Sequence, residues 1–276
     1  MHASGRDPLI DPDDLAALVA SGGCTVLDVR YRMGGPPGAA EYARGHVPGA
    51  AYVDLDTALA SAPGPGGRHP LPDPAVFEDA MRAGGVRNDL PVVVYDDWAG
   101  RAAARCWWLL RWAGHEDVRV LDGGWSAWVE AGHEQSDVQK SPQVGDFAAR
   151  PGLLHVLAVD DVLGVVERGV LIDARDAERF RGEVEPVDPV AGHVPGAVNV
   201  PTGANLTGDG RFRSAGDLRR VYAAAEGREA AVYCGSGVTA AHGILAMAVA
   251  GIDATLYPGS WSEWVTDPTR PVATGD

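Results

Sequence analysis

The stretch EAAVYCGSGVTAAHGILAMAVAG, from Glu229 to Gly251, decides the fold. It opens with a short apolar run that is typical of a buried strand and closes with an apolar run of helical length. Between them lies CGSGVTA, Cys234–Ala240, which contains two glycines. A strand that ends in such a turn before a helix predicts a parallel α/β sheet. The turn then lies at the carboxyl ends of the strands, where ligands bind in this class of sheet.

Cys234 stands where such a turn favours negative charge. Backbone N–H groups converge at the N-terminus of the helix, and the helix dipole adds positive potential there. We therefore expect the Cys234 thiol to be present largely as the nucleophilic thiolate. Gly235 and Gly237 permit the backbone angles of the turn, and Ser236 and Thr239 add hydroxyl donors. A buried structural cysteine is the alternative, but glycines at alternate positions have little use in packing.

The chain contains the same pattern twice. VLDVR and GHVPGA in the first half, starting at Val26 and Gly45, correspond to LIDAR and GHVPGA in the second half. Further along, PVVVYDDWAGRAAAR matches EAAVYCGSGVTAAHG, and DGGWSAW matches PGSWSEW. Four matching blocks in one order predict a duplicated domain. The alignment places Asp96 at the position of Cys234, so we expect thiol chemistry only in the second half.

Length and composition fit two domains. The chain has 276 residues, of which 46% are hydrophobic, so each half can bury a core. We predict an inactive domain over residues 1–140 and a catalytic domain over residues 150–276, joined by a polar linker over residues 133–149. Alternating strands and helices predict an α/β fold in which each domain is a short, mostly parallel sheet with helices on both faces. The predicted strands are Val26–Val29, Val92–Tyr95, Val118–Leu121, Val170–Asp173 and Ala231–Tyr233, and the predicted helices are Pro12–Ala20, Pro74–Ala83, Gly100–Trp112, Val159–Arg168 and Ala215–Ala225.

Charge and cysteine content limit the compartment and the partners. A formal net charge of −15 disfavours nucleic acid and anionic membranes as partners. The apolar run Ile244–Ile252 is too short to span a bilayer, and the N-terminal residues lack the apolar region of a secretory signal. Three widely spaced cysteines form neither a disulfide framework nor a CxxC metal motif, and we interpret Cys24 and Cys106 as core residues. We therefore expect a cytoplasmic protein without a metal site.

The chain resembles the tandem rhodanese-domain sulfurtransferases over nearly its whole length. The resemblance rests on GHVPGA in both halves, on Asp96 in the inactive copy, and on the Cys loop before a helix. The loop CGSGVTA is similar to that of the 3-mercaptopyruvate sulfurtransferases. The resemblance implies that Cys234 takes sulfane sulfur from a small anionic donor, 3-mercaptopyruvate. It further implies that the resulting Cys234 persulfide passes the sulfur to thioredoxin, another thiol or cyanide, and that the reaction needs no cofactor.

The same resemblance assigns roles to individual residues. Ser236 matches a serine that works with the catalytic cysteine, and Arg179 in RFRG matches the arginine that holds the anionic substrate. His46 matches a histidine that the family couples to that serine. The aspartate that completes this relay in the family has no clear match in GGPPGAAEY. The active-site loop is completed by Gly235, Gly237, Val238 and Thr239.

Two features bear on the choice of donor. The thiosulfate-using rhodaneses carry basic residues where this chain has Gly235 and Ser236, so thiosulfate:cyanide sulfur transfer is the alternative reaction. The mercaptopyruvate enzymes carry a second arginine where this chain has Val187, and a single guanidinium binds a carboxylate less firmly than two. Arg68 and His69, in the loop GGRHPLP, are the candidates to supply the missing donor.

Repetition helps to separate structural residues from functional ones. His46 recurs as His193, so a structural role for His46 is an equal alternative to a catalytic one. The recurring pairs Asp28–Arg30 and Asp173–Arg175 are interpreted as structural, as are the recurring tryptophans. Cys234 and Arg179 have no copy in the first half, which favours a functional role for both.

Two other classes of function share this kind of loop. A phosphatase or arsenate reductase would also use a thiolate among backbone N–H groups, but it wants an arginine six positions after the cysteine, where this chain has Ala240. A non-catalytic sulfide-binding module would not need the intact cysteine and its glycines.

Overall fold

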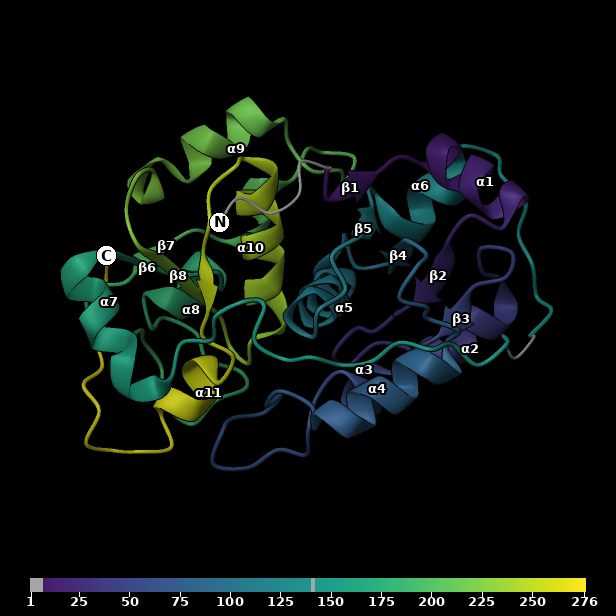
Figure 1. The fold of residues 1–276 in the computed structure, drawn as a ribbon. Coiled ribbons are helices and arrows are strands. Elements are labelled where there is room, and N and C mark those ends of the chain that lie inside the picture. Colours follow the sequence, from purple (N-terminus) through teal and green to yellow (C-terminus); the bar gives the residue numbers. More distant parts are fainter. Residues whose placement is uncertain (1–6, 140–141) are drawn as a thin grey trace. The chain divides into compact units, whose positions relative to one another are not determined.

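The computed structural model describes residues 7–139 and 142–276 (Figure 1). Residues 1–6 and 140–141, which fall in the predicted inactive domain and linker, lie outside the described residues. The chain divides into two compact units. The first unit contains the residues up to Ser61 together with Pro72–Leu154 and Asp209–Arg211, and the second contains Ala62–Leu71, His155–Gly208 and Phe212–Asp276.

This division differs from the predicted one at two places. Much of the stretch predicted as a linker belongs to the first unit, where the Gly145 N–H donates to the Arg82 carbonyl oxygen at 2.8 Å and Phe147 packs edge-on against Phe77. The segment Ala62–Leu71 comes from the first half of the sequence but belongs to the second unit. Because of this exchange, Arg68 and His69 lie in the same unit as Cys234.

The first unit is built on a parallel sheet of five strands in the order β1-β5-β4-β2-β3. Side chains alternate along β4, so Val93 and Tyr95 share a buried cluster with Leu15 and Trp128, while Val92 and Val94 point to the opposite face. Its strands are β1 (Leu9–Ile10), β2 (Thr25–Asp28), β3 (Ala51–Tyr52), β4 (Val92–Tyr95) and β5 (Val118–Leu121), and its helices are α1 (Pro12–Ser21), α2 (Gly38–Arg44), α3 (Leu55–Ala58), α4 (Pro74–Ala83), α5 (Arg101–Trp112) and α6 (Gly124–Glu130).

The second unit repeats this plan with four parallel strands in the order β7-β6-β8-β9. Figure 1 shows these strands lying between α7 and α10. The strands are β6 (Val170–Asp173), β7 (Val198–Asn199), β8 (Ala230–Tyr233) and β9 (Thr255–Leu256), and the helices are α7 (Val162–Arg168), α8 (Ala177–Phe180), α9 (Ala215–Val221), α10 (Val238–Val249) and α11 (Ser260–Trp264), with 3-10 turns at Val159–Asp161, Thr202–Asn205 and Ala223–Ala225.

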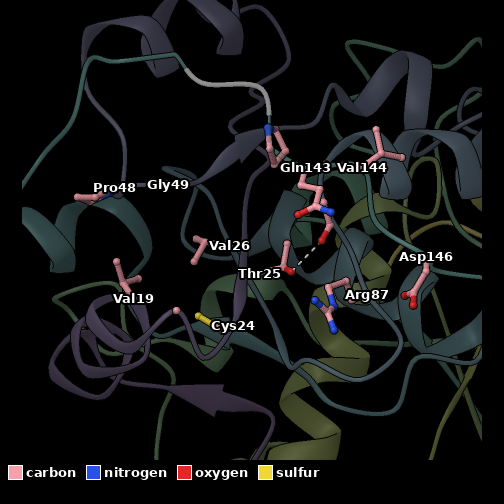
Figure 2. A pocket seen from close by; sticks show the side chains of 14 residues that line it. Val19, Cys24, Thr25, Val26, Pro48, Gly49, Arg87, Gln143, Val144 and Asp146 are labelled. Atoms are coloured by element: carbon pink, nitrogen blue, oxygen red, sulfur yellow. Dashed lines mark hydrogen bonds between the residues drawn. The ribbon is translucent and has the colours of Figure 1, made fainter.

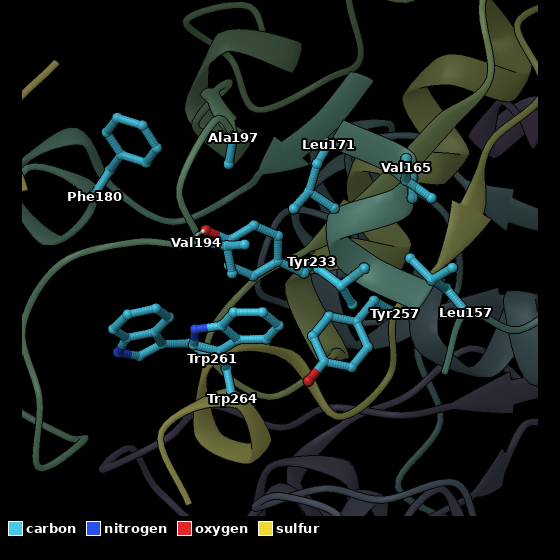
Figure 3. Close-up of a cluster of buried hydrophobic side chains, with 12 residues drawn as sticks. Leu157, Val165, Leu171, Phe180, Val194, Ala197, Tyr233, Tyr257, Trp261 and Trp264 are labelled. Atoms are coloured by element: carbon cyan, nitrogen blue, oxygen red, sulfur yellow. Dashed lines mark hydrogen bonds between the residues drawn. The ribbon is translucent and has the colours of Figure 1, made fainter. Parts of the chain in front are cut away.

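The core of the second unit anchors the end of β8. Tyr233 lies in a cluster with Leu171 of β6 and with Trp261 and Trp264 of α11 (Figure 3), and these side chains are at most 2% exposed. On the other face, a Cβ built on Gly243 of α10 would lie 3.2 Å from Val232, so the helix packs closely on the strand. The residue that follows Tyr233 is therefore held in place from both faces of the sheet.

The predicted α/β fold with two parallel sheets is confirmed. The predicted helix Val159–Arg168 begins as a 3-10 turn before α7, and the predicted helix Ala215–Ala225 ends as α9 at Val221 before a further 3-10 turn. The two-residue strands β1, β3, β7 and β9 were not predicted, because so short a run shows no periodicity. In the part of the chain that the structure describes, no helix has both the length and the apolar character needed to cross a membrane.

Candidate active site at the Cys234 loop

The Cys234 loop connects β8 to α10 at the carboxyl end of the sheet. Gly237 is the N-cap of α10 and has φ = 78°, a backbone angle that favours glycine. A Cβ on Gly237 would lie 2.3 Å from the Pro258 carbonyl oxygen, so no larger residue fits. The Gly237 N–H donates a hydrogen bond to the Cys234 Sγ at 3.1 Å. This N–H, at the start of a 12-residue helix, stabilises negative charge on the sulfur.

The segment at the start of α11 braces the loop backbone. The Cys234 N–H donates to the Ser260 Oγ at 3.1 Å, and its carbonyl oxygen accepts from the Trp261 N–H at 3.0 Å. The Ser262 N–H donates to the Gly235 carbonyl oxygen at 2.9 Å. Ser260 is fully buried and has φ = 55°, a strained value for a residue other than glycine. The sequence reasoning assigned no role to Ser260, although the first copy has Gly124 at this position of the repeat.

Ser236 contacts a histidine, but a different one from the histidine that the family resemblance suggested. The Ser236 Oγ lies 2.8 Å from the Nδ1 of His69. His46 belongs to the first unit, where its Nδ1 lies 2.9 Å from the Tyr42 carbonyl oxygen and its ring stacks on that of Tyr42. His193 repeats this arrangement with Phe180 in the second unit, at 2.7 Å. These matching contacts support the structural interpretation of His46, and the partner of Ser236 is His69.

Two arginines lie beside the loop. Measured from the place that a Cβ on Gly235 would occupy, the Arg68 Nη2 is 3.2 Å away, and the Arg179 Nη1 and Nη2 are 3.5 and 3.7 Å away. The two side chains are 24% and 18% exposed. The Arg68 Nε is buried and has no hydrogen-bond partner among the described residues. The loop after Cys234 is therefore flanked by two guanidinium groups, one of them from the segment that the first half of the sequence supplies.

Two carboxylates that the sequence reasoning did not single out hold these arginines. Glu185 accepts hydrogen bonds from the Arg179 Nε and Nη2 at 3.1 and 2.6 Å. Asp188 accepts from the Arg68 Nη1 at 2.7 Å and from the Arg179 Nη2 at 3.2 Å. Both carboxylate side chains are only 4% exposed. The sequence carried a signal, because both residues belong to EPVD, which is separated from RFRG by two residues and has no counterpart in the first half.

The pKa of Glu185 is lowered overall. Burial acts to raise the pKa, but the hydrogen bonds from Arg179 and from the backbone N–H groups of Asp188 and Val187 outweigh it. Glu185 is therefore ionised at neutral pH. It also lies 3.4 Å from the Nη1 of Arg175, which connects the site to the buried pair Arg175–Asp173.

The first unit has a cavity of ≈ 560 Å³ at the amino ends of its strands (Figure 2). The half-buried Cys24 lines it, and burial raises the pKa of this thiol to about 11, so the thiol is neutral near pH 7. The cavity lies at the amino ends of the strands, whereas Asp96 follows the carboxyl end of β4. Ligands of parallel sheets bind at the carboxyl ends. Among the residues that the structure describes, no cluster of His, Cys, Asp and Glu has the makings of a metal site.

The fold and this loop define a duplicated α/β protein with a cysteine at one of two equivalent strand ends. The family model described as a rhodanese-like domain matches residues 11–131 and 159–267. The chain therefore belongs to the rhodanese family.

Similar proteins carry sulfurtransferase names. A Mycobacterium tuberculosis protein named "Putative thiosulfate sulfurtransferase SseB" is 46% identical over 100% of this chain and 99% of its own length. A Pseudomonas aeruginosa protein named "Probable 3-mercaptopyruvate sulfurtransferase" is 47% identical over 97% of this chain and 98% of its own length. The solved structure of a 3-mercaptopyruvate sulfurtransferase from Leishmania major superposes with a TM-score of 0.85 at 32% identity, over 98% of this chain and 77% of that chain. These relatives confirm the predicted enzyme class, a sulfurtransferase.

Proposed function

We propose that this sulfurtransferase takes sulfur from 3-mercaptopyruvate through a persulfide on Cys234. The observation that carries the proposal is the pair of guanidinium groups, Arg68 and Arg179, which both lie close to the small residue Gly235. Two planar guanidiniums suit a carboxylate, and the absence of a side chain at Gly235 leaves room for a three-carbon donor. Arg68 then supplies the second donor at a site where Val187 cannot.

In the proposed reaction the Cys234 thiolate attacks the sulfur of the donor. The new S–S bond forms as the C–S bond breaks, and the electron pair of the C–S bond leaves with the carbon as the enolate of pyruvate. The proton of the donor thiol passes to the enolate carbon, which gives pyruvate and an enzyme persulfide. We assign the handling of this proton to Ser236 and His69, whose Oγ and Nδ1 lie 2.8 Å apart. The Gly237 N–H stabilises the thiolate before the attack.

In the second half of the reaction an acceptor removes the outer sulfur. A thiolate such as that of thioredoxin, or cyanide, attacks the terminal sulfur of the persulfide, and the S–S bond breaks with its electron pair returning to the Cys234 sulfur. The products are a persulfide of the acceptor or thiocyanate, and the Cys234 thiolate is restored. Covalently bound sulfur is the only carrier group that this cycle requires.

Thiosulfate is the second candidate donor, because one relative with 46% identity carries that name. Four charged groups argue against a dianion here. Glu185 and Asp188 offset the charges of Arg179 and Arg68, so these four side chains together carry no net positive charge that would attract a dianion. The deciding experiment is to measure kcat/KM for both donors with cyanide as the common acceptor. The proposal expects 3-mercaptopyruvate to be the better donor, and a preference for thiosulfate would overturn it.

A further inference from the structure

Asp188 occupies a particular place in this site. Its carboxylate bridges the two arginines, with its Oδ1 2.7 Å from the Arg68 Nη1 and its Oδ2 3.2 Å from the Arg179 Nη2 and 3.5 Å from the Arg68 Nη2. These are the same guanidinium groups that flank Gly235. A carboxylate of the protein itself therefore makes the contacts with both arginines that a donor carboxylate would make.

Arg179 does not need Asp188 in order to be held. Glu185 binds Arg179 through two hydrogen bonds, at 3.1 and 2.6 Å, and is itself held by the backbone N–H groups of Val187 and Asp188. Glu185 thus fixes the orientation of the guanidinium from the side of its Nε. The contact of Asp188 with Arg179 is a single, longer bond on top of this arrangement.

The contacts of Asp188 affect the charge that an incoming donor meets at the two arginines. Arg68 and Arg179 carry two positive charges, and Glu185 and Asp188 carry two negative charges. As long as Asp188 stays in place the cluster is neutral, and the repulsion between Asp188 and an incoming anion offsets part of the attraction by the arginines. The repulsion grows in proportion to the charge of the anion, so a dianion is opposed twice as strongly as a monoanion.

We propose that Asp188 is a specificity-determining residue that competes with anionic donors for Arg68 and Arg179 and so discriminates against dianions. This inference rests on the proposed function, in which the two arginines receive the donor. A monoanionic carboxylate donor displaces Asp188 from the arginines at moderate cost. Thiosulfate, with two charges, is admitted less readily.

The test is the variant Asp188→Asn, which keeps the size of the side chain and removes its charge. KM should fall by about fivefold for 3-mercaptopyruvate and by about 25-fold for thiosulfate, because the electrostatic energy doubles with the charge of the donor. The ratio of kcat/KM for thiosulfate to that for 3-mercaptopyruvate should therefore rise by about fivefold. The matched control is Glu183→Gln, which removes one charge from the same segment, where Glu183 pairs with Arg181. The control should leave both KM values unchanged.

A second measurement does not depend on sulfur transfer. Iodoacetate, an anion, and iodoacetamide, its neutral analogue, both alkylate a thiolate with loss of iodide, and mass spectrometry identifies the product on Cys234. The ratio of the two rates should rise by about fivefold in Asp188→Asn, since only the anion senses the lost charge. If the ratio is unchanged, or if KM rises equally for both donors, Asp188 merely positions Arg68 and the inference is wrong. If the rate ratio rises although neither donor is used, the inference about the charge holds and the proposed function fails.

Discussion

The strands β4 and β8 are each followed by a loop and a helix with an N-cap glycine, but the first residue of the loop is Asp96 in the first unit and Cys234 in the second. In the first unit the Asp96 carboxylate accepts hydrogen bonds from the N–H groups of Trp98, Gly100 and Ala103, at 2.8, 2.8 and 2.9 Å. In the second unit the Cys234 Sγ accepts one from the Gly237 N–H at 3.1 Å. In the first loop the Asp96 carboxylate therefore occupies backbone N–H groups that would otherwise be available to a bound anion. The comparison shows that the carboxylate of Asp96 takes up backbone N–H groups of its own loop, whereas the Cys234 sulfur accepts a single such bond.

The two loops also differ in length. The N-cap glycines, Gly100 and Gly237, have almost the same φ, 80° and 78°, but Gly100 lies four residues after Asp96 and Gly237 lies three after Cys234. The ungapped alignment of the two copies missed this extra residue. Elsewhere the copies agree closely: the Arg30 Nη2 donates to the Asp28 carboxylate and to the Gly45 carbonyl oxygen, each at 2.6 Å, and Arg175 repeats both contacts at 2.6 Å in the second unit. The predicted structural pairs are thus confirmed.

The largest effect should come from removing the thiol, which only the second of the two loops carries. Cys234→Ser should abolish sulfur transfer, because the serine hydroxyl is not ionised near neutral pH and cannot replace the thiolate. The measurement is the rate of thiocyanate formation together with the mass of the persulfide. Cys24→Ser is the control and should keep full activity, since Cys24 lines a cavity of the first unit and does not belong to the Cys234 loop. Residual turnover in Cys234→Ser would contradict the mechanism.

Substitutions of His69 and His46 should separate the histidine that contacts Ser236 from the one that packs in the first unit. His69→Ala should lower kcat by about 100-fold with 3-mercaptopyruvate, because it removes the partner of the Ser236 hydroxyl. His46→Ala should leave kcat unchanged and lower the free energy of unfolding by about 2 kcal/mol, because it removes a buried stacked ring. Kinetics and urea denaturation of both variants provide the check. The reverse pattern would restore His46 to the catalytic role that the family resemblance implied.

The arginine that has no copy in the first half should matter mainly for binding. Arg179→Ala should raise the KM for 3-mercaptopyruvate by roughly 10- to 100-fold, because a charge-assisted contact with the donor carboxylate is lost. Steady-state kinetics with both donors measures the effect. Arg181→Ala is the control, since Arg181 pairs with Glu183 rather than with the residues around Gly235. An unchanged KM for both donors would refute the donor assignment but not the persulfide.

Asp96 should be important for stability. Asp96→Ala removes a fully buried carboxylate and leaves three backbone N–H groups without their acceptor, and we expect a loss of about 3 kcal/mol of unfolding free energy. Urea denaturation measures this loss. The neighbouring variant Asp97→Ala should cost less than about 1 kcal/mol, because its side chain is partly exposed. Equal losses in the two variants would show that the Asp96 carboxylate does not satisfy the loop.

The smallest effect concerns acid stability. The pKa of Glu185 in the folded protein is lowered from its ordinary value of 4.5. Its ionised form therefore adds stability above pH 4.5, and this stability is lost as the pH falls through the lower pKa of the folded state. The loss of stability of the wild type below pH 4.5 should be steeper than that of Glu185→Gln. Urea denaturation between pH 3 and pH 7 tests this, and parallel curves would mean that Glu185 is not held as an anion.

Much of the architecture was predictable because it depends on local patterns. The strand Val92–Tyr95 and the helix Pro74–Ala83 were predicted with the observed bounds, since one is a β-branched run and the other has Pro at its first turn after Asp73. The alignment of the two copies showed that only the second has a cysteine at the strand end, where the first has Asp96. EPVD marks a segment that only the second half contains, but the pairing of Glu185 and Asp188 with the arginines was not predicted, because the segment has no regular structure whose spacing shows which side chains meet.

The sequence by itself determined the parallel sheets, the repeat and the position of Cys234 at a strand end, because periodicity and turn residues act over a few positions. Only the tertiary structure decided that Arg68 and His69 lie beside that cysteine. The backbone N–H of Arg68 donates a hydrogen bond to the Ser262 Oγ at 3.0 Å, and the two residues are 194 positions apart in the sequence. Gly67, at φ = 100°, lies so close to the Gly259 carbonyl oxygen that a Cβ would approach within 2.7 Å. Contacts of this separation form only when the chain has folded, and no local pattern in GGRHPLP indicates them.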